Sequence, residues 1–137
     1  MRPVGFPPIT SQAKALIAAR AALEKHAEAV TVLDLRALST VTDYFVICTA
    51  GSSPQLSAIK DHIDDQLRGK GSGVGHEEGV PAQGGGPLWV LLDCGDVVVH
   101  LLNETARAFY RLEQLWADAP HLTLDALAAR APTAPAG

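Results

Sequence analysis

The feature that most constrains this sequence is an almost unbroken apolar run, Tyr-Phe-Val-Ile-Cys-Thr-Ala, at residues 44–50. Such a run is typical of a strand that is covered on both faces, in the middle of a sheet that carries helices. Gly51 ends the run, and residues 52–55 (Ser-Ser-Pro-Gln) favour a helix start, with proline in the first turn and Ser52 and Gln55 spaced as a capping box. The sequence therefore predicts a buried central strand that leads directly into a helix.

Apolar residues at helical spacing predict three helices around this strand. The first, capped by Thr10 or Ser11, is expected to bury the stripe Leu16, Ala19, Leu23 and Ala27. The second begins at residues 52–55 and is expected to bury Leu56, Ile59, Ile63 and Leu67. The third, capped by Asn103, is expected to bury Ala106, Phe109, Leu112 and Trp116.

Runs rich in β-branched and aliphatic residues predict the remaining strands. One covers residues 30–35, and a short one covers residues 76–79. Residues 88–93 and 96–102 are separated by Cys94-Gly95, which is hairpin spacing. This order of elements predicts an α/β fold, in which a mixed β-sheet of about five strands is flanked by helices.

Composition and the proline-rich ends indicate how the chain is organised. Hydrophobic residues make up 47% and charged residues 19% of the sequence, a globular balance. We expect a flexible leader at 1–11, a folded domain at 12–118 and an Ala/Pro-rich tail at 119–137. No apolar stretch reaches the roughly 20 residues that span a bilayer. Two cysteines form neither a disulfide framework nor a zinc site, so we expect a cytoplasmic protein that does not associate with membranes.

The distribution of charge indicates the kind of partner. A net charge of −4 argues against a protein that grips nucleic-acid phosphates over its surface. Residues 71–106 contain no Lys or Arg, and their carboxylates share one neighbourhood if the hairpin packs beside the short strand; these are Glu77, Glu78, Asp93, Asp96 and Glu104. They form either a solvated acidic face or a docking surface for a basic protein. Trp89 lies next to them and either packs in the core or anchors an interface.

The sequence offers little for catalysis. His100 interrupts an apolar strand, where a histidine is more often structural than catalytic. Gly51-Ser52 could serve as the Gly-Ser of a nucleotidyltransferase, but such an enzyme needs paired carboxylates on a strand to hold magnesium. Asp93 and Asp96 flank a turn instead. We therefore expect no enzymatic activity, no metal and no cofactor, with a nucleotidyltransferase-type enzyme kept as an alternative.

Three blocks of the sequence resemble the ribosomal silencing factor family (RsfS, or Iojap-like). They are residues 43–53, then Glu78-Gly79 together with 89–100, and finally 107–116. The blocks keep the order of the family over residues 12–118. Cys94 departs from the pattern, because it occupies a turn position that is usually aromatic in this family.

This resemblance implies a nucleotidyltransferase-like core without known catalytic activity. It also implies binding to the large ribosomal subunit through its protein uL-fourteen, with neighbouring ribosomal protein or rRNA contacts, and a homodimer when free. The bound protein would block joining of the small subunit and so repress translation under nutrient limitation. The matching positions expected to bind the partner are Asp43, Glu78, Gly79, Trp89, Asp93, Asp96 and His100. A dimeric adaptor that acts off the ribosome remains a further alternative.

Overall fold

A six-stranded mixed sheet organises the structure, a computed structural model that describes residues 9–80 and 88–130. The strands are β1 Glu28–Asp34, β2 Tyr44–Thr49, β3 His76–Val80, β4 Trp89–Asp93, β5 Val97–Leu102 and β6 His121–Leu122. Their order across the sheet is β3-β4-β5-β2-β1-β6, in which β2 and β5 run parallel and the other neighbours antiparallel. The predicted mixed sheet is confirmed, with β6 as a strand that the sequence did not predict.

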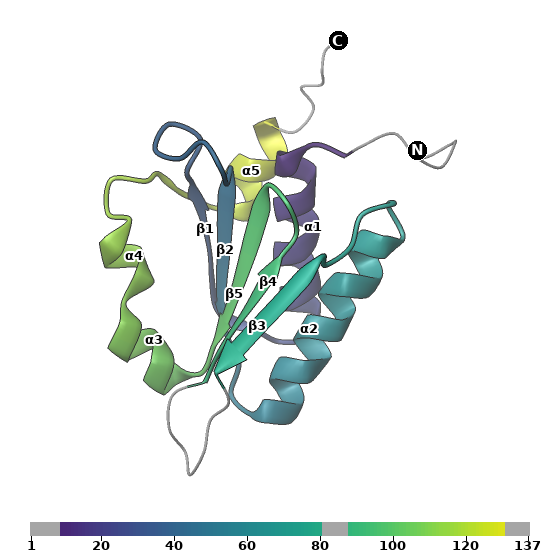
Figure 1. The fold of residues 1–137 in the computed structure, drawn as a ribbon, viewed down its shortest axis with the longest axis vertical. Coiled ribbons are helices and arrows are strands. Elements are labelled where there is room, and N and C mark those ends of the chain that lie inside the picture. Colours follow the sequence, from purple (N-terminus) through teal and green to yellow (C-terminus); the bar gives the residue numbers. More distant parts are fainter. Residues whose placement is uncertain (1–8, 81–87, 131–137) are drawn as a thin grey trace.

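Helices cover the two faces of this sheet unequally. They are α1 Ser11–Glu24, α2 Ser53–Arg68, α3 Glu104–Tyr110, α4 Leu112–Leu115 and α5 Leu124–Arg130. Figure 1 shows α1 and α2 on one side of the sheet and the short α3 and α4 on the other. We call these sides the first face and the second face. The predicted α/β fold with flanking helices is confirmed.

The central strand β2 contributes to both faces, as the apolar run predicted. Val46 and Cys48 belong to the large cluster under α1 and α2, whereas Ile47 belongs to the smaller cluster under α3 and α4. Phe45 also packs on that smaller cluster. Because alternate residues of a strand point to opposite faces, only a continuous apolar run can fill both layers.

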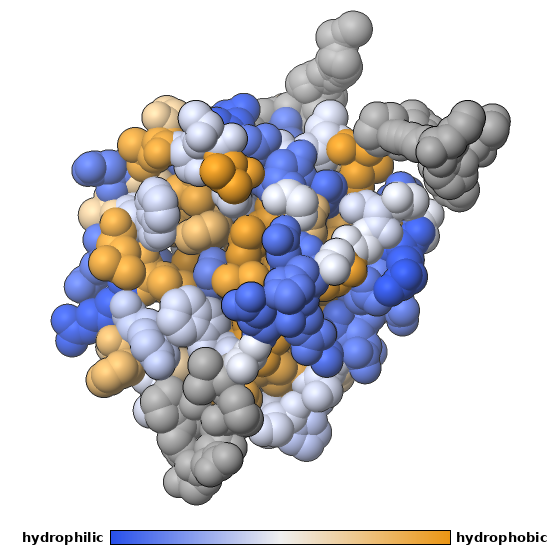
Figure 2. Space-filling view, in the orientation of Figure 1, coloured by the Kyte–Doolittle hydropathy of each residue, from blue (hydrophilic) through white to orange (hydrophobic). Residues whose placement is uncertain are grey.

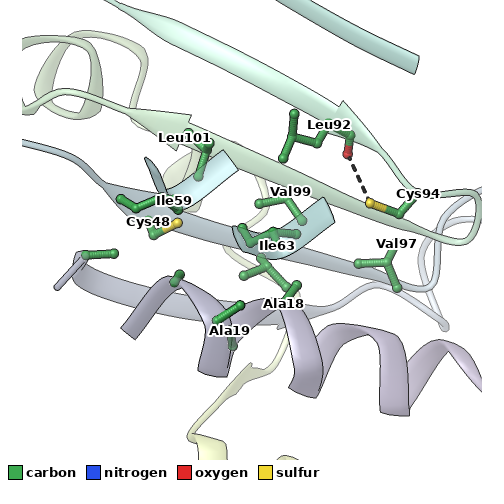
Figure 3. Packing of buried hydrophobic residues seen from close by; sticks show 14 of the residues in the cluster. Ala18, Ala19, Cys48, Ile59, Ile63, Leu92, Cys94, Val97, Val99 and Leu101 are labelled. Carbon is green, nitrogen blue, oxygen red and sulfur yellow. Dashed lines mark hydrogen bonds between the residues drawn. The ribbon is translucent and has the colours of Figure 1, made fainter. Parts of the chain in front are cut away.

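Helix α2 begins and packs as predicted. The Ser52 side chain accepts a hydrogen bond from the backbone N–H of Gln55 at 3.1 Å, and the Gln55 side chain accepts one from the N–H of Gly51 at 2.6 Å. These bonds satisfy N–H groups that a helix start leaves free. The predicted stripe is buried: Leu56, Ile59, Ile63 and Leu67. Figure 3 shows Ile59 and Ile63 among the side chains of the first face.

Helix α1 is capped by Thr10 as predicted, and its expected stripe is confirmed in part. Ala19 and Ala27 are buried, although Ala27 lies beyond the helix end, and Leu16 packs against the core. Leu23 is 43% exposed, so its burial was predicted wrongly. The buried residues are all alanines: Ala15, Ala18, Ala19, Ala21 and Ala22. Small side chains let α1 lie close to both the sheet and α2. Close packing therefore favours alanine over leucine on the buried side of this helix. Figure 3 shows Ala18 and Ala19 facing this core.

The first part of the expected tail, residues 119–130, is folded. Strand β6 pairs with β1, and α5 packs against α1 with Leu127 fully buried. The side chain of Gln12 also donates to the carbonyl of Leu127 at 2.9 Å. The expectation that the fold ends at residue 118 is therefore wrong, because the fold continues to residue 130. Strand β6 covers the edge of β1, and α5 covers part of α1. Residues 131–137 and the start of the leader, 1–8, lie outside the described residues.

The predicted third helix is two helices. Asn103 caps α3 as expected, but Arg111 has a φ of 50° in the left-handed region and separates α3 from α4. Ala106 and Leu112 are buried as expected, but Phe109 is 70% exposed. Burial of Phe109 was therefore predicted wrongly, because α3 is only seven residues long and buries Ala106 alone.

Candidate functional site

The second face is open at the side of β3 and β4. The residues packed in its smaller cluster come from β1, β2, the end of β5 and the segments around α3 and α4, with Trp89 at the margin. Beyond Trp89, the alternation along β4 places Leu91 and Asp93 on the same face. Figure 2 shows hydrophilic side chains over β3 beside hydrophobic ones on the side of α3 and α4.

Trp89 stands at this margin in a cluster of rings. Its indole Nε1 donates a hydrogen bond to Nδ1 of His100 at 3.0 Å. Its ring packs on Tyr110 with 4.5 Å between the centroids, and Phe45 packs edge-on against His100 at the same distance. Trp89 is half-buried, so one part of the indole supports the core while another part stays accessible.

A hollow of about 250 Å³ adjoins the accessible part of Trp89. Its lining residues are Glu78, Gly79, Trp89 and Leu91. Two apolar side chains and one carboxylate thus meet in the same depression, which can receive an apolar or cationic side chain of a partner. Gly79 is tightly placed: a Cβ there would lie 3.2 Å from Cγ2 of Val90, which is tighter than ordinary contact.

The five carboxylates of the Lys- and Arg-free stretch do not share one neighbourhood. Glu77 pairs with Lys60 of α2 at 3.2 Å, and Asp96 pairs with Lys14 of α1 at 2.8 Å. Glu104 begins α3, after the far end of β5. The expectation of a common acidic surface is therefore wrong, because strand alternation separates Glu77 from Glu78 and because distant helices supply the cations.

The partner-binding residues expected from the sequence divide into three groups. Glu78, Gly79 and Trp89 line the hollow, and Asp93 lies further along β4 on the same face. Asp43 lies where β2 begins, and its backbone N–H donates to the carbonyl of Asp96 at the β4–β5 turn. His100 is only 4% exposed, beneath Trp89, so it does not offer a contact surface of its own.

Leu91 is a site residue that the sequence analysis did not name. It lines the hollow and pairs across the sheet with both Glu78 and His100. Its signal was present in the sequence, since residues two apart on a strand share a face and Leu91 is two residues from Trp89. What the sequence did not reveal is that none of the helices among residues 9–80 and 88–130 covers this end of the face.

Asp93 and the two cysteines have distinct surroundings. Asp93 accepts a hydrogen bond from the N–H of Gly95 at 2.9 Å, within the turn where Gly95 has a φ of 91°. Burial raises the pKa of the Cys48 thiol to about 12 and that of Cys94 to about 11. Within residues 9–80 and 88–130, no three His, Cys, Asp or Glu side chains gather as metal ligands, and no helix is long and apolar enough to cross a membrane.

Fold and site together define a small α/β protein whose sheet has one closed face and one face with an open aromatic margin. A family model described as ribosomal silencing factor during starvation matches residues 8–136. The ribosomal silencing factor RsfS of Bacillus subtilis is 44% identical over 109 residues, which cover 80% of this chain and 89% of that protein.

Solved structures show the same fold. A crystal structure of a Chromobacterium violaceum protein has a TM-score of 0.70 at 27% identity, covering 80% of this chain and 88% of that one. A crystal structure of a Bacillus halodurans protein has a TM-score of 0.66 at 33% identity, covering 82% and 98%. The chain belongs to the ribosomal silencing factor (RsfS) family.

Proposed function

We propose that this protein binds the large ribosomal subunit through its protein uL-fourteen and sterically prevents the small subunit from joining. Translation is thereby repressed under nutrient limitation, in the cytoplasm, without any bond being made or broken. The observation that carries the proposal is the accessible indole of Trp89 beside the hollow that Glu78, Gly79 and Leu91 line, in a chain of this family.

The shape of the site supports a protein partner. Aromatic residues near the centre of an interface contribute much of its binding free energy when a partner excludes water from them. Trp89 is already fixed on one side by Tyr110 and His100, so little side-chain entropy remains to be lost when a partner covers it. The hollow beside it gives a partner side chain a place to insert.

The charge of the site supports a basic partner. Glu78 is exposed, and its only partner among the described side chains is His76, whose Nε2 lies 2.9 Å from its Oε2. Asp93 lies on the same face of the neighbouring strand. These two carboxylates, rather than all five of the Lys- and Arg-free stretch, favour binding to a cationic surface. They raise the association rate and fix the register in which the two surfaces meet.

Sedimentation with separated ribosomal subunits tests the proposal. The protein is mixed with purified large subunits, small subunits or both, at the magnesium concentration that allows joining. We expect it to sediment with the large subunit alone and to lower the fraction of joined ribosomes. Sedimentation with the small subunit, or joining that proceeds normally while the protein is bound, would contradict the proposal.

A further inference from the structure

We infer that His100 is a positioning residue, which accepts the indole N–H of Trp89 and so fixes the orientation in which that ring meets the partner. The inference rests on the proposed function for its consequence, although the orientation itself is a property of the free protein. Trp89 and His100 lie on neighbouring strands of the second face, and Nε1 and Nδ1 are 3.0 Å apart.

The direction of this hydrogen bond fixes the state of His100. An indole nitrogen can only donate, so Nδ1 of His100 must accept and carry no proton. The neutral ring then has its proton on Nε2. A positively charged His100 would have protons on both nitrogens, and its Nδ1–H would oppose the N–H of Trp89. The present position of the indole therefore requires a neutral histidine.

The surroundings of His100 indicate that the histidine does more than fill space. Its Nε2 is buried and has no hydrogen-bond partner among the described residues. Leaving a polar atom unpaired in the interior has a free-energy cost, which an apolar side chain of similar size would avoid. Phe45 packs against one side of the ring, so an apolar replacement would also find suitable neighbours. What only the histidine provides is the acceptor for Trp89.

The acceptor matters because the ring contact with Tyr110 does not by itself set the rotation of the Trp89 indole. Its ring packs on Tyr110 at an interplanar angle of 48°, a tilted contact that sets the distance between the rings but does not fix rotation. The hollow lies beside the accessible part of the indole. A rotated indole would therefore change the wall of the hollow as well as the aromatic surface offered to a partner.

The free protein allows a test that needs no mutation and no ribosome. Heteronuclear NMR is used to measure the two-bond nitrogen–nitrogen coupling across the Trp89–His100 hydrogen bond and the tautomer of His100. We expect a measurable coupling and an unprotonated Nδ1 at neutral pH. An unresolved coupling together with a proton on Nδ1 would overturn the inference, whatever the protein does on the ribosome.

Two variants then connect the orientation to binding. His100→Phe keeps a ring but removes the acceptor, whereas His100→Asn keeps an acceptor oxygen near the position of Nδ1. We expect His100→Phe to move the Trp89 indole N–H signal upfield, to speed its hydrogen exchange and to weaken binding to large subunits roughly three- to tenfold, the usual range for one neutral hydrogen bond. His100→Asn should retain the wild-type signal and affinity more closely, and the signal of Trp116 is the internal reference.

The outcomes separate this inference from the proposed function. If His100→Phe folds and leaves the Trp89 signal and its exchange unchanged, the inference fails, even where Trp89→Ala still abolishes binding. If Trp89→Ala binds large subunits like the wild type, the proposed anchor fails, while the coupling in the free protein still reports the hydrogen bond. If His100→Asn does not fold, the nitrogen–nitrogen coupling in the wild type and the measurements on His100→Phe test the inference.

Discussion

Arg107 of α3 and Glu113 of α4 are joined by a hydrogen-bonded ion pair across Arg111, the residue at which the two helices separate. Nε of Arg107 donates to Oε2 of Glu113 at 3.0 Å, and Nη1 donates to the hydroxyl of Thr49 in β2 at 2.9 Å. A third bond reaches the hydroxyl of Thr31 in β1 at 3.3 Å. One guanidinium thus attaches both short helices to the centre of the sheet.

Removing this attachment should destabilise the protein. We expect Arg107→Met to lower the free energy of unfolding by about 2 to 3 kcal/mol, because it leaves a partly buried carboxylate and two hydroxyls without their donor. Glu113→Gln should cost less, about 1 kcal/mol, since the amide oxygen still accepts. Urea denaturation measures both, with Glu104→Gln as an exposed control. Equal stability of Arg107→Met and wild type would show that packing alone holds α3 and α4.

The ion pair of Arg107 and Glu113 also makes the free energy of unfolding depend on pH. Burial alone would raise the pKa of Glu113, but the hydrogen bonds and charge of Arg107 outweigh it and hold that pKa below its ordinary value of 4.5. The stability from this pair is therefore complete above about pH 4.5 and is lost as pH falls through the lowered pKa.

Trp89→Ala should weaken binding to the large subunit by about 2 kcal/mol, as truncation of an interface anchor does. Because the indole also packs on Tyr110, the variant is first compared with the wild type by thermal unfolding. Binding is measured by titration of purified large subunits. Leu23→Ala is the matched control, since Leu23 is an exposed apolar side chain on α1. Unchanged affinity in a folded Trp89→Ala variant would remove Trp89 from the interface.

Charge reversal on the open face should weaken binding more than the same reversal elsewhere. We expect Glu78→Lys to weaken binding, and binding by the wild type to weaken as salt is raised. Asp65→Lys changes the net charge equally, but it lies exposed on α2 at the first face. If both variants bind alike, net charge rather than the local carboxylate governs association.

His100 adds a second acid-sensitive element. Burial lowers its pKa from 6.5 to about 4, so between these values the unfolded chain binds a proton that the folded protein excludes. Stability should therefore rise with pH across this window, and on the order of 3 kcal/mol should be lost by about pH 4. The difference between the wild type and His100→Phe isolates this contribution from the carboxylates. Parallel pH profiles for the two proteins would show that His100 does not titrate with unfolding.

The two thiols should be inert in the folded protein. Cys48 is fully buried under α1 and α2, and Cys94 is buried at the β4–β5 turn. With pKa values of about 12 and about 11, both remain protonated near neutral pH, and a thiol is far less nucleophilic than a thiolate. A disulfide reagent should label neither at pH 8 until denaturant is added. Rapid labelling of one thiol would reveal local opening around it.

The sequence predicted those parts of the fold that a local pattern determines and missed those that packing between distant segments determines. Residues 44–55 were predicted correctly, because a continuous apolar run and a capping box are local signals. The buried stripe of α1 was predicted only in part, because the alanines that face the core differ little from other alanines in the sequence.

The site shows the same division. Trp89 faces away from Leu88 and Val90, which lie in the other cluster, as the alternation of side chains along a strand requires. The grouping of the five carboxylates failed because Lys14 and Lys60 are distant in sequence from Asp96 and Glu77. Which side chains remain available to a partner is therefore set by tertiary contacts that no local pattern contains.

The contact between α1 and α5 joins two segments that lie 115 residues apart in the sequence. Closing so long a loop costs chain entropy, which the strands and helices between the two segments offset as they fold. Loss of α5 would leave its side of α1 in water, so the alanine-lined helix depends on a neighbour that is remote along the chain.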